Sequence, residues 1–190
     1  NKPPQFRGSD FAMRYEQGRW SEERLIESLS LSGQFIGLSY GRSMLGPKDK
    51  TRIKEYWRKF VEVEGDAKRP DILVLPADVV ARNREAWADL MKDPTTRTDE
   101  ELRPILENAI CGLEAENSLW VAEKMPDYNS TLPVSRLNPV TPRIWVKDED
   151  IAGLLEWQKR QPRIPICVVQ VFYDRAFIIP LERVLKLVDK

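Results

Sequence analysis

Three carboxylates lie on or beside apolar, strand-like runs of this sequence. Asp71 directly precedes the apolar run at residues 72–75, and Glu114 and Glu116 end the run at residues 110–116. Residues two apart on a strand point to the same side of a sheet, so we expect Glu114 and Glu116 to share a face. A charge buried in a sheet is costly unless a cation compensates it. We therefore expect the three carboxylates to converge on a divalent metal. Mg²⁺ suits them, because it takes oxygen ligands and acts mainly on phosphate groups.

The same residues resemble the active-site pattern of the PD-(D/E)XK nucleases, the superfamily that contains most type II restriction endonucleases. Pro70 and Asp71 match its PD element, and Glu114, Ala115 and Glu116 occupy the place of its (D/E)-X-K element. The sequence departs from the pattern at the last position, where Glu116 replaces lysine. That exchange occurs in a minority of restriction enzymes.

The resemblance implies a role for each carboxylate. Asp71 and Glu114 are expected to bind Mg²⁺, which holds a phosphate oxygen and lowers the pKa of a bound water. Glu116 is expected to position or deprotonate that water, or to bind a second ion. Because the usual lysine is missing, more metal ions or another cation are needed, and Lys124 is one candidate. The alternative is that Asp71 is a turn residue and that both glutamates face solvent from an edge strand.

Composition narrows the chemistry. A chain of 190 residues is long enough for one domain with a real core, and we expect a single nuclease domain over residues 1–190, with an N-terminal helical part (1–59) and a catalytic core (60–190). Histidine is absent, which excludes His-based acid/base chemistry and His-containing zinc sites. Thirty basic and thirty acidic residues give no net charge, but phosphate binding depends on local clustering.

The compartment follows from the cysteines and the apolar runs. The chain has two cysteines without a C-x-x-C pair, and we expect reduced, buried thiols and a cytoplasmic location. No apolar run approaches the roughly 20 residues that span a bilayer, so we expect no membrane partner. The chain begins with Asn1 rather than methionine, and we expect further residues before it.

Hydrophobic periodicity and turn residues predict an α/β fold, a mixed β-sheet flanked by helices. We expect a helix capped by Ser21 and a short strand or buried turn at residues 34–40. The remaining expected elements are a hairpin at 60–64 and 71–75, helices at 77–91 and from about 99, a strand through Glu114, a helix at 117–124, strands at 143–147, 164–173 and 176–179, and helices from 148 and from 180. This order agrees with a restriction-endonuclease-like core, whose acidic residues lie on a hairpin and the next strand.

Several polar residues outside the carboxylates are candidates for supporting roles. Related folds often place a glutamate on the opening helix, which makes Glu23 and Glu27 candidates, and Glu62 and Glu64 share one face of the predicted hairpin. Base reading in a DNA groove needs Arg, Asn, Gln or Lys on loops near the cleft. The candidates on the proline-rich segment are Asn129, Ser130, Arg136 and Asn138. The tryptophans, Trp145 among them, fall near apolar stripes and are expected in the core or an interface.

The sequence therefore predicts a Mg²⁺-dependent, sequence-specific endonuclease of double-stranded DNA, a type II restriction enzyme. Residues 146–174 are similar to AccI-type restriction endonucleases. Two antiparallel strands must be cut and the chain carries one carboxylate cluster, so we expect a homodimer. Two alternatives remain open: another PD-(D/E)XK nuclease, of repair or mobile elements, and a non-catalytic interaction domain whose carboxylates are merely solvated.

Overall fold

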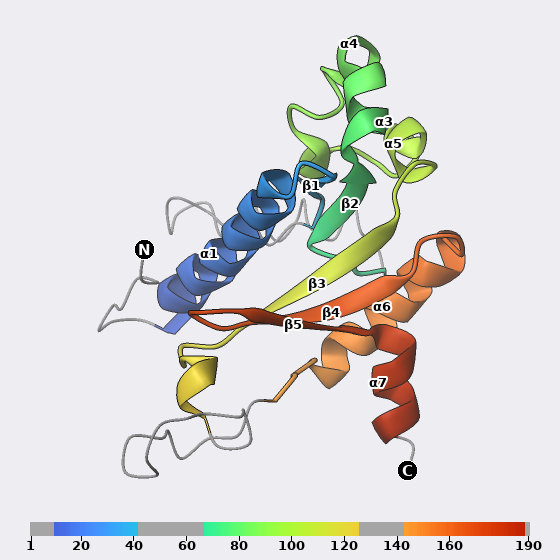
Figure 1. The fold of residues 1–190 in the computed structure, drawn as a ribbon. Coiled ribbons are helices and arrows are strands. Elements are labelled where there is room, and N and C mark those ends of the chain that lie inside the picture. The colour runs from blue at the N-terminus through green and yellow to red at the C-terminus, as the bar shows by residue number, and fades with distance from the viewer. Residues whose placement is uncertain (1–9, 42–66, 126–142, 189–190) are drawn as a thin grey trace.

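The computed structural model describes residues 10–41, 67–125 and 143–188 of the chain (Figure 1). It shows an α/β protein with one five-stranded mixed sheet in the order β1-β2-β3-β4-β5. The strands are β1 (Phe35–Ser39), β2 (Ile72–Pro76), β3 (Cys111–Asn117), β4 (Ile166–Val171) and β5 (Ala176–Pro180). The pair β3 and β4 is parallel, and the other neighbours are antiparallel. The predicted α/β class and mixed sheet are confirmed.

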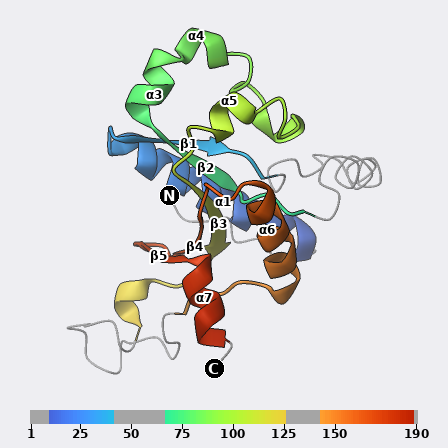
Figure 2. The same cartoon turned by 90° about the vertical axis from the view of Figure 1, so that its right-hand side faces the viewer.

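Helices cover both faces of the sheet (Figures 1 and 2). The long helix α1 (Asp10–Leu31) packs on one face, where Ile26 and Leu29 meet the β2 side chains Ile72 and Val74. Helices α6 (Asp148–Arg160) and α7 (Leu181–Val188) pack on the other face, where the buried Trp157 joins the main core. Alternate residues of each strand thus face different layers, as the two-residue period of a strand requires.

Short helices follow β2 and lead into β3. They are α3 (Ala77–Arg82), α4 (Arg84–Trp87), the 3-10 turn η3 (Pro94–Thr96) and α5 (Arg103–Leu106). The predicted helix at 77–91 is thus divided at Asn83, whose backbone leaves the helical conformation with φ −103° and ψ 11°. The helix expected from about 99 is only the four residues of α5.

Other local predictions need correction. The helix expected at 117–124 is wrong, because β3 continues to Asn117 and only the 3-10 turn η4 (Ala122–Lys124) follows. The strand expected at 143–147 is also wrong, since this segment pairs with no strand in the described part of the chain. Ser21 does not cap a helix: it lies inside α1, where its hydroxyl donates to the carbonyl of Gly18 at 2.7 Å. The strand alternative for residues 34–40 is confirmed by β1.

Some predictions fall outside the described residues. The hairpin strand at 60–64 and the boundary between residues 59 and 60 lie there, and the described partners of β2 are β1 and β3. Cys111 and Cys167 carry free thiols and are half-buried rather than fully buried. Among the residues that the structure describes, no helix combines the length and the apolar character that crossing a bilayer requires.

A buried polar network holds the segment that enters β2. Arg69 contacts the Asp99 carboxylate at 2.5 Å and lies over the Tyr40 ring, 4.6 Å from its centre. The Tyr40 hydroxyl donates to Asp99 at 2.5 Å and accepts from the Trp157 indole N–H at 3.0 Å. This set, the Arg69 network, ties β1, α6 and the segment before β2 together, and it fixes the backbone that carries Lys68 and Asp71.

Candidate metal centre

Strand β3 presents two glutamates on the face that α6 covers. Glu114 and Glu116 alternate with Leu113, which packs against the α1 layer, so both carboxylates point to the opposite side. Glu114 is 3% exposed, whereas Glu116 is half-buried. The predicted shared face is confirmed by this arrangement.

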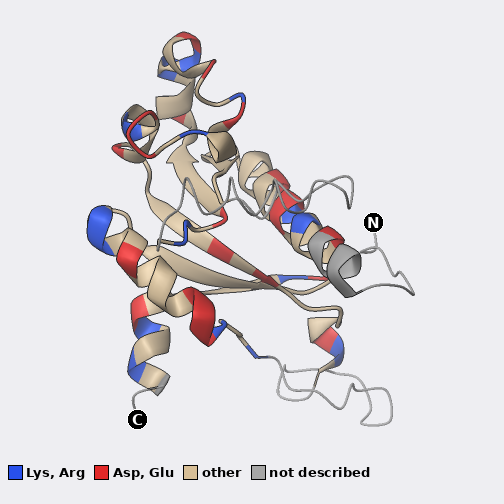
Figure 3. Ribbon diagram, turned by 180° about the vertical axis from the view of Figure 1, so that it is seen from behind, with Lys and Arg blue, Asp and Glu red and all other residues tan. Residues whose placement is uncertain are grey.

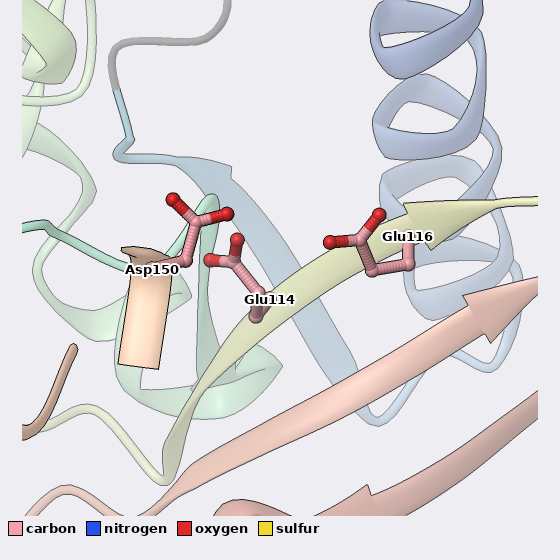
Figure 4. A group of neighbouring side chains, drawn as sticks. All are labelled: Glu114, Glu116 and Asp150. Atoms are coloured by element: carbon pink, nitrogen blue, oxygen red, sulfur yellow. The ribbon is translucent and has the colours of Figure 1, made fainter. Parts of the chain in front are cut away.

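A third carboxylate comes from the first turn of α6, which follows β3 along the chain and leads into its parallel neighbour β4. Asp150 offers an oxygen that lies, with one from Glu114 and one from Glu116, in a group whose members are all within 4.8 Å of one another. Figure 4 shows Asp150 and Glu114 directed toward each other, with Glu116 farther along β3. We call these three residues the carboxylate cluster. Sequence analysis missed Asp150, because acidic residues in a first helical turn are common for electrostatic reasons alone.

Asp71 lies beside the cluster rather than among its three converging oxygens. It is buried at the entrance to β2, and one carboxylate oxygen accepts a hydrogen bond from the backbone N–H of Ala115 at 2.8 Å. Ala115 stands between Glu114 and Glu116, so this bond ties Asp71 to the part of β3 that carries both. Its negative charge contributes to raising the pKa of Glu114.

Lys68 places a cation directly against Glu114. Its ammonium group forms an ion pair with Glu114 and a second one with Asp150 at 3.0 Å. Burial alone would lower the Lys68 pKa, but the charges of Glu114, Asp71 and Asp150 outweigh that effect and hold the pKa above its ordinary value. Lys124, the cation considered from sequence, is exposed in η4. Lys68 stands three residues before Asp71 in the sequence, which is one signal that could have identified it. Its ion-pair partners, however, lie far along the chain, on β3 and α6.

Close packing of α6 sets the distance between Lys68 and Asp150. A Cβ added at Gly153 would lie 2.7 Å from the Lys68 Cβ and 2.9 Å from its backbone nitrogen. Real side chains essentially never come so close, so only glycine lets the helix approach at this point. Gly112 plays a similar part under Pro70, whose Cγ would lie 2.5 Å from an added Cβ.

The charge and burial of the cluster favour the binding of another cation. Burial, and then the charge of Asp71, raise the Glu114 pKa well above its usual range despite the Lys68 pair. Burial also raises the pKa of Glu116, which the charge of Lys147 partly opposes. The second carboxylate oxygen of Glu114, Oε2, is buried and accepts no hydrogen bond from the described residues. A buried acceptor without a partner costs about 1–3 kcal/mol, and a bound cation would satisfy it.

The cluster therefore fits a hard divalent ion. Its donors are carboxylate oxygens alone, which suits Mg²⁺, Ca²⁺ or Mn²⁺ better than softer metals. Glu114, Glu116 and Asp150 would hold the ion, and the α6 N-terminus would offset part of the negative charge.

The remaining sequence candidates do not join the cluster. Glu23 and Glu27 are exposed on α1 and pair with Arg19 and Arg24, each at 2.8 Å. The buried glutamate of this helix is instead Glu22, which is 2% exposed.

The predicted base-reading residues Asn129, Ser130, Arg136 and Asn138 lie outside the described residues, as do Glu62 and Glu64. Comparison with protein-family models, with curated proteins and with solved structures gives no match for this chain.

Proposed function

We propose that this chain is a Mg²⁺-dependent endonuclease that hydrolyses phosphodiester bonds in double-stranded DNA. The observation that carries the proposal is the buried Glu114, whose Oε2 accepts no hydrogen bond from the described residues and whose side chain belongs to an all-carboxylate cluster beside Lys68. Carboxylates that hold a divalent ion next to an ammonium group are suited to phosphate chemistry, because both cations counter negative charge on a phosphate.

The arrangement supports the restriction-endonuclease-like interpretation of the sequence. The acidic residues lie at the entrance to β2 and on β3, its antiparallel neighbour, as that resemblance implies. Glu116 stands in place of the motif lysine in this sequence. Lys68 instead brings an ammonium group to Glu114. We propose that Lys68 does the work of that lysine, countering the charge that develops on the phosphate during attack.

Each residue has a role in this proposal. A divalent ion held by Glu114, Glu116 and Asp150 would polarise a phosphate oxygen and lower the pKa of a bound water. Glu116 would hold the ion together with Glu114 and Asp150 and orient the attacking water beside it. Asp71 holds β3 through Ala115 and adds negative charge that favours metal binding.

Double-strand cleavage by a chain with one such cluster leads us to propose a homodimer as the working unit. Large apolar side chains that remain exposed near the C-terminal end support a contact there: Ile178 on the edge strand β5 and Leu187 on α7. Light scattering on the protein with a cognate duplex tests this proposal, and a 1:1 complex that still makes concerted double-strand breaks would contradict it.

Adjacent residues of α6 offer a matched test of the function. Asp150→Asn removes one cluster carboxylate, whereas Glu149→Gln removes an exposed carboxylate from the same helical turn. We expect supercoiled plasmid to be cut by the parent and by Glu149→Gln in Mg²⁺ but not in EDTA. Asp150→Asn should be at least ~10²-fold slower, because it loses a metal ligand. Equal cleavage rates for the two variants would refute the proposed centre.

A further inference from the structure

The segment before α6 presents an alternating row of side chains to solvent. Ile144 and Val146 pack against the main core, while Arg143, Trp145 and Lys147 are exposed. Trp145 is 62% exposed, so it does not lie in the core of this chain. In extended chain, alternate side chains stand about 6.6 Å apart, so this row spans roughly 13 Å.

A buried glutamine fixes the row next to the carboxylate cluster. The backbone N–H of Trp145 donates to the Gln170 side-chain oxygen at 3.1 Å, and Gln170 is buried in β4 directly opposite Glu116. At the other end, the Lys147 ammonium lies 3.8 Å from an Asp150 oxygen. The row therefore ends at the candidate metal centre. Figure 3 shows blue in this segment immediately before the red first turn of α6.

The composition of the row fits a nucleic-acid strand better than an apolar partner. A tryptophan between two cations offers one flat face for a base and a positive charge on each side for phosphates, and base–aromatic stacking contributes about 1–3 kcal/mol per base. A fully paired duplex keeps its bases stacked on one another, so only an unpaired base can reach such a face. Of the tryptophans that the structure describes, Trp120 is also exposed, but it has Ser118 and Ala122 at the corresponding positions and lacks the cations.

We propose that Arg143, Trp145 and Lys147 form a binding strip for a single-stranded segment of DNA, with one unpaired base stacked on Trp145 and phosphates against the two cations. This inference rests on the proposed function and names its substrate class. In this proposal the strip holds the single-stranded side of a junction, while the bond that is cut lies on the double-stranded side.

Binding without cleavage tests the strip. Fluorescence anisotropy in EDTA compares three labelled probes: a blunt duplex, the same duplex with a single-stranded tail, and the tail alone. The parent should bind the tailed duplex more tightly than the blunt one. Trp145→Ala should weaken binding of the tailed duplex about 5- to 150-fold, whereas Trp145→Phe should retain most of the affinity. Trp120→Ala is the matched control and should leave the affinity unchanged.

Salt dependence tests the cations separately. Arg143→Gln and Lys147→Gln should each reduce the slope of log affinity against log salt by about 0.7 for the single strand, because each removes one phosphate contact. Thermal unfolding checks folding, since changes at exposed positions usually stay within about 0.5 kcal/mol.

The outcomes separate the strip from the proposed hydrolysis. Equal affinity of the parent and Trp145→Ala for the tailed duplex, or equal binding of blunt and tailed probes by the parent, would overturn the strip even if the protein cuts plasmid. A protein that binds the tail through Trp145 but cuts no DNA in Mg²⁺ would instead support the strip and overturn the endonuclease proposal.

Discussion

Lys68 and Arg69 are neighbours in the chain, yet each enters a buried charge group of a different kind. In the Arg69 network, one guanidinium faces the carboxylate of Asp99, and the Tyr40 hydroxyl bridges that carboxylate to the Trp157 indole. Around Lys68 the carboxylates outnumber the cations. The ammonium groups of Lys68 and Lys147 face four acidic side chains: Asp71, Glu114, Glu116 and Asp150.

The difference separates a group that stabilises the fold from one that we propose binds a metal ion. The Arg69 network is balanced in charge, and burial raises the Tyr40 pKa, so its hydroxyl stays neutral and keeps donating to Asp99. Each group retains a buried polar atom without a hydrogen-bond partner among the described residues, Arg69 Nη1 and Glu114 Oε2, but the cluster around Lys68 also keeps an excess of acid. Such an excess costs stability, and regions that keep it are candidates for binding or catalysis.

The largest expected effect is on cleavage by Glu114 variants. Glu114→Ala removes the most buried ligand and should slow plasmid cleavage by roughly 10²–10³-fold in Mg²⁺. Glu114→Gln keeps the shape and should lose as much activity without loss of folding. Single-turnover rates and circular dichroism measure both quantities. A folded Glu114→Gln protein that cuts like the parent would break the comparison, because the Lys68 side would then be structural too.

The corresponding change in the Arg69 network is Asp99→Asn, which should affect stability rather than cleavage. It leaves the Arg69 guanidinium without its carboxylate, and we expect a loss of about 2–3 kcal/mol in the free energy of unfolding, at the low end for a buried pair because Asp99 is partly exposed. Urea unfolding measures it. The variant should still gain stability from Mg²⁺. If the stability is unchanged and the Mg²⁺ response is lost, the two groups have been assigned the wrong way round.

Sequence reasoning found the strand partners of the site but not the helix and the cation. β2 and β3 are short apolar runs with acids at fixed positions, and the period of two places Glu114 and Glu116 on one face wherever the strand lies. Lys68 and Asp150 meet only because α6 packs closely at Gly153, and no local pattern encodes that approach.

The wrongly predicted strand at residues 143–147 has a related cause, because a tertiary contact decided its local structure. The apolar and polar alternation at residues 143–147 looks like a strand, and the burial does alternate. The Trp145 N–H, however, bonds to the Gln170 side chain instead of to a strand within the described residues. Periodicity reports which face is buried, but it does not report the hydrogen-bond partner.

Metal binding should stabilise one group and leave the other unaffected. At a Mg²⁺ concentration about 100 times its Kd, the parent should gain about 2.7 kcal/mol, which is roughly 5–10 °C in Tm for a chain of this size. Asp150→Asn should lose most of this gain, and Glu149→Gln should keep it. Thermal unfolding in Mg²⁺ and in EDTA supplies the comparison. A gain of equal size in Asp150→Asn would place the ion elsewhere.

The smallest expected effect is the pH dependence of stability without metal. Burial and the charge of Asp71 raise the Glu114 pKa in the folded protein, so the native state holds a proton that the unfolded chain releases at about pH 4.3. The native state binds more protons in this window, and therefore the free energy of unfolding falls as the pH rises from the unfolded to the folded pKa. Glu114→Gln has no titratable side chain at this position, so its free energy of unfolding should lack this part of the fall with rising pH.

Carboxyls with a lowered pKa act in the opposite sense. Burial disfavours ionised Asp174, but hydrogen bonds from Ala122, Arg175 and Glu123 outweigh it and lower the Asp174 pKa. The stability that ionised Asp174 contributes is therefore lost as the pH falls. Asp174 is unchanged in Glu114→Gln, and the difference between the two urea-unfolding profiles in EDTA therefore isolates Glu114. That difference should persist in an Asp99→Asn background, because the Arg69 network does not supply the proton. Parallel profiles for the parent and Glu114→Gln would show that Glu114 is ionised in the metal-free protein, and that Lys68 already neutralises the cluster.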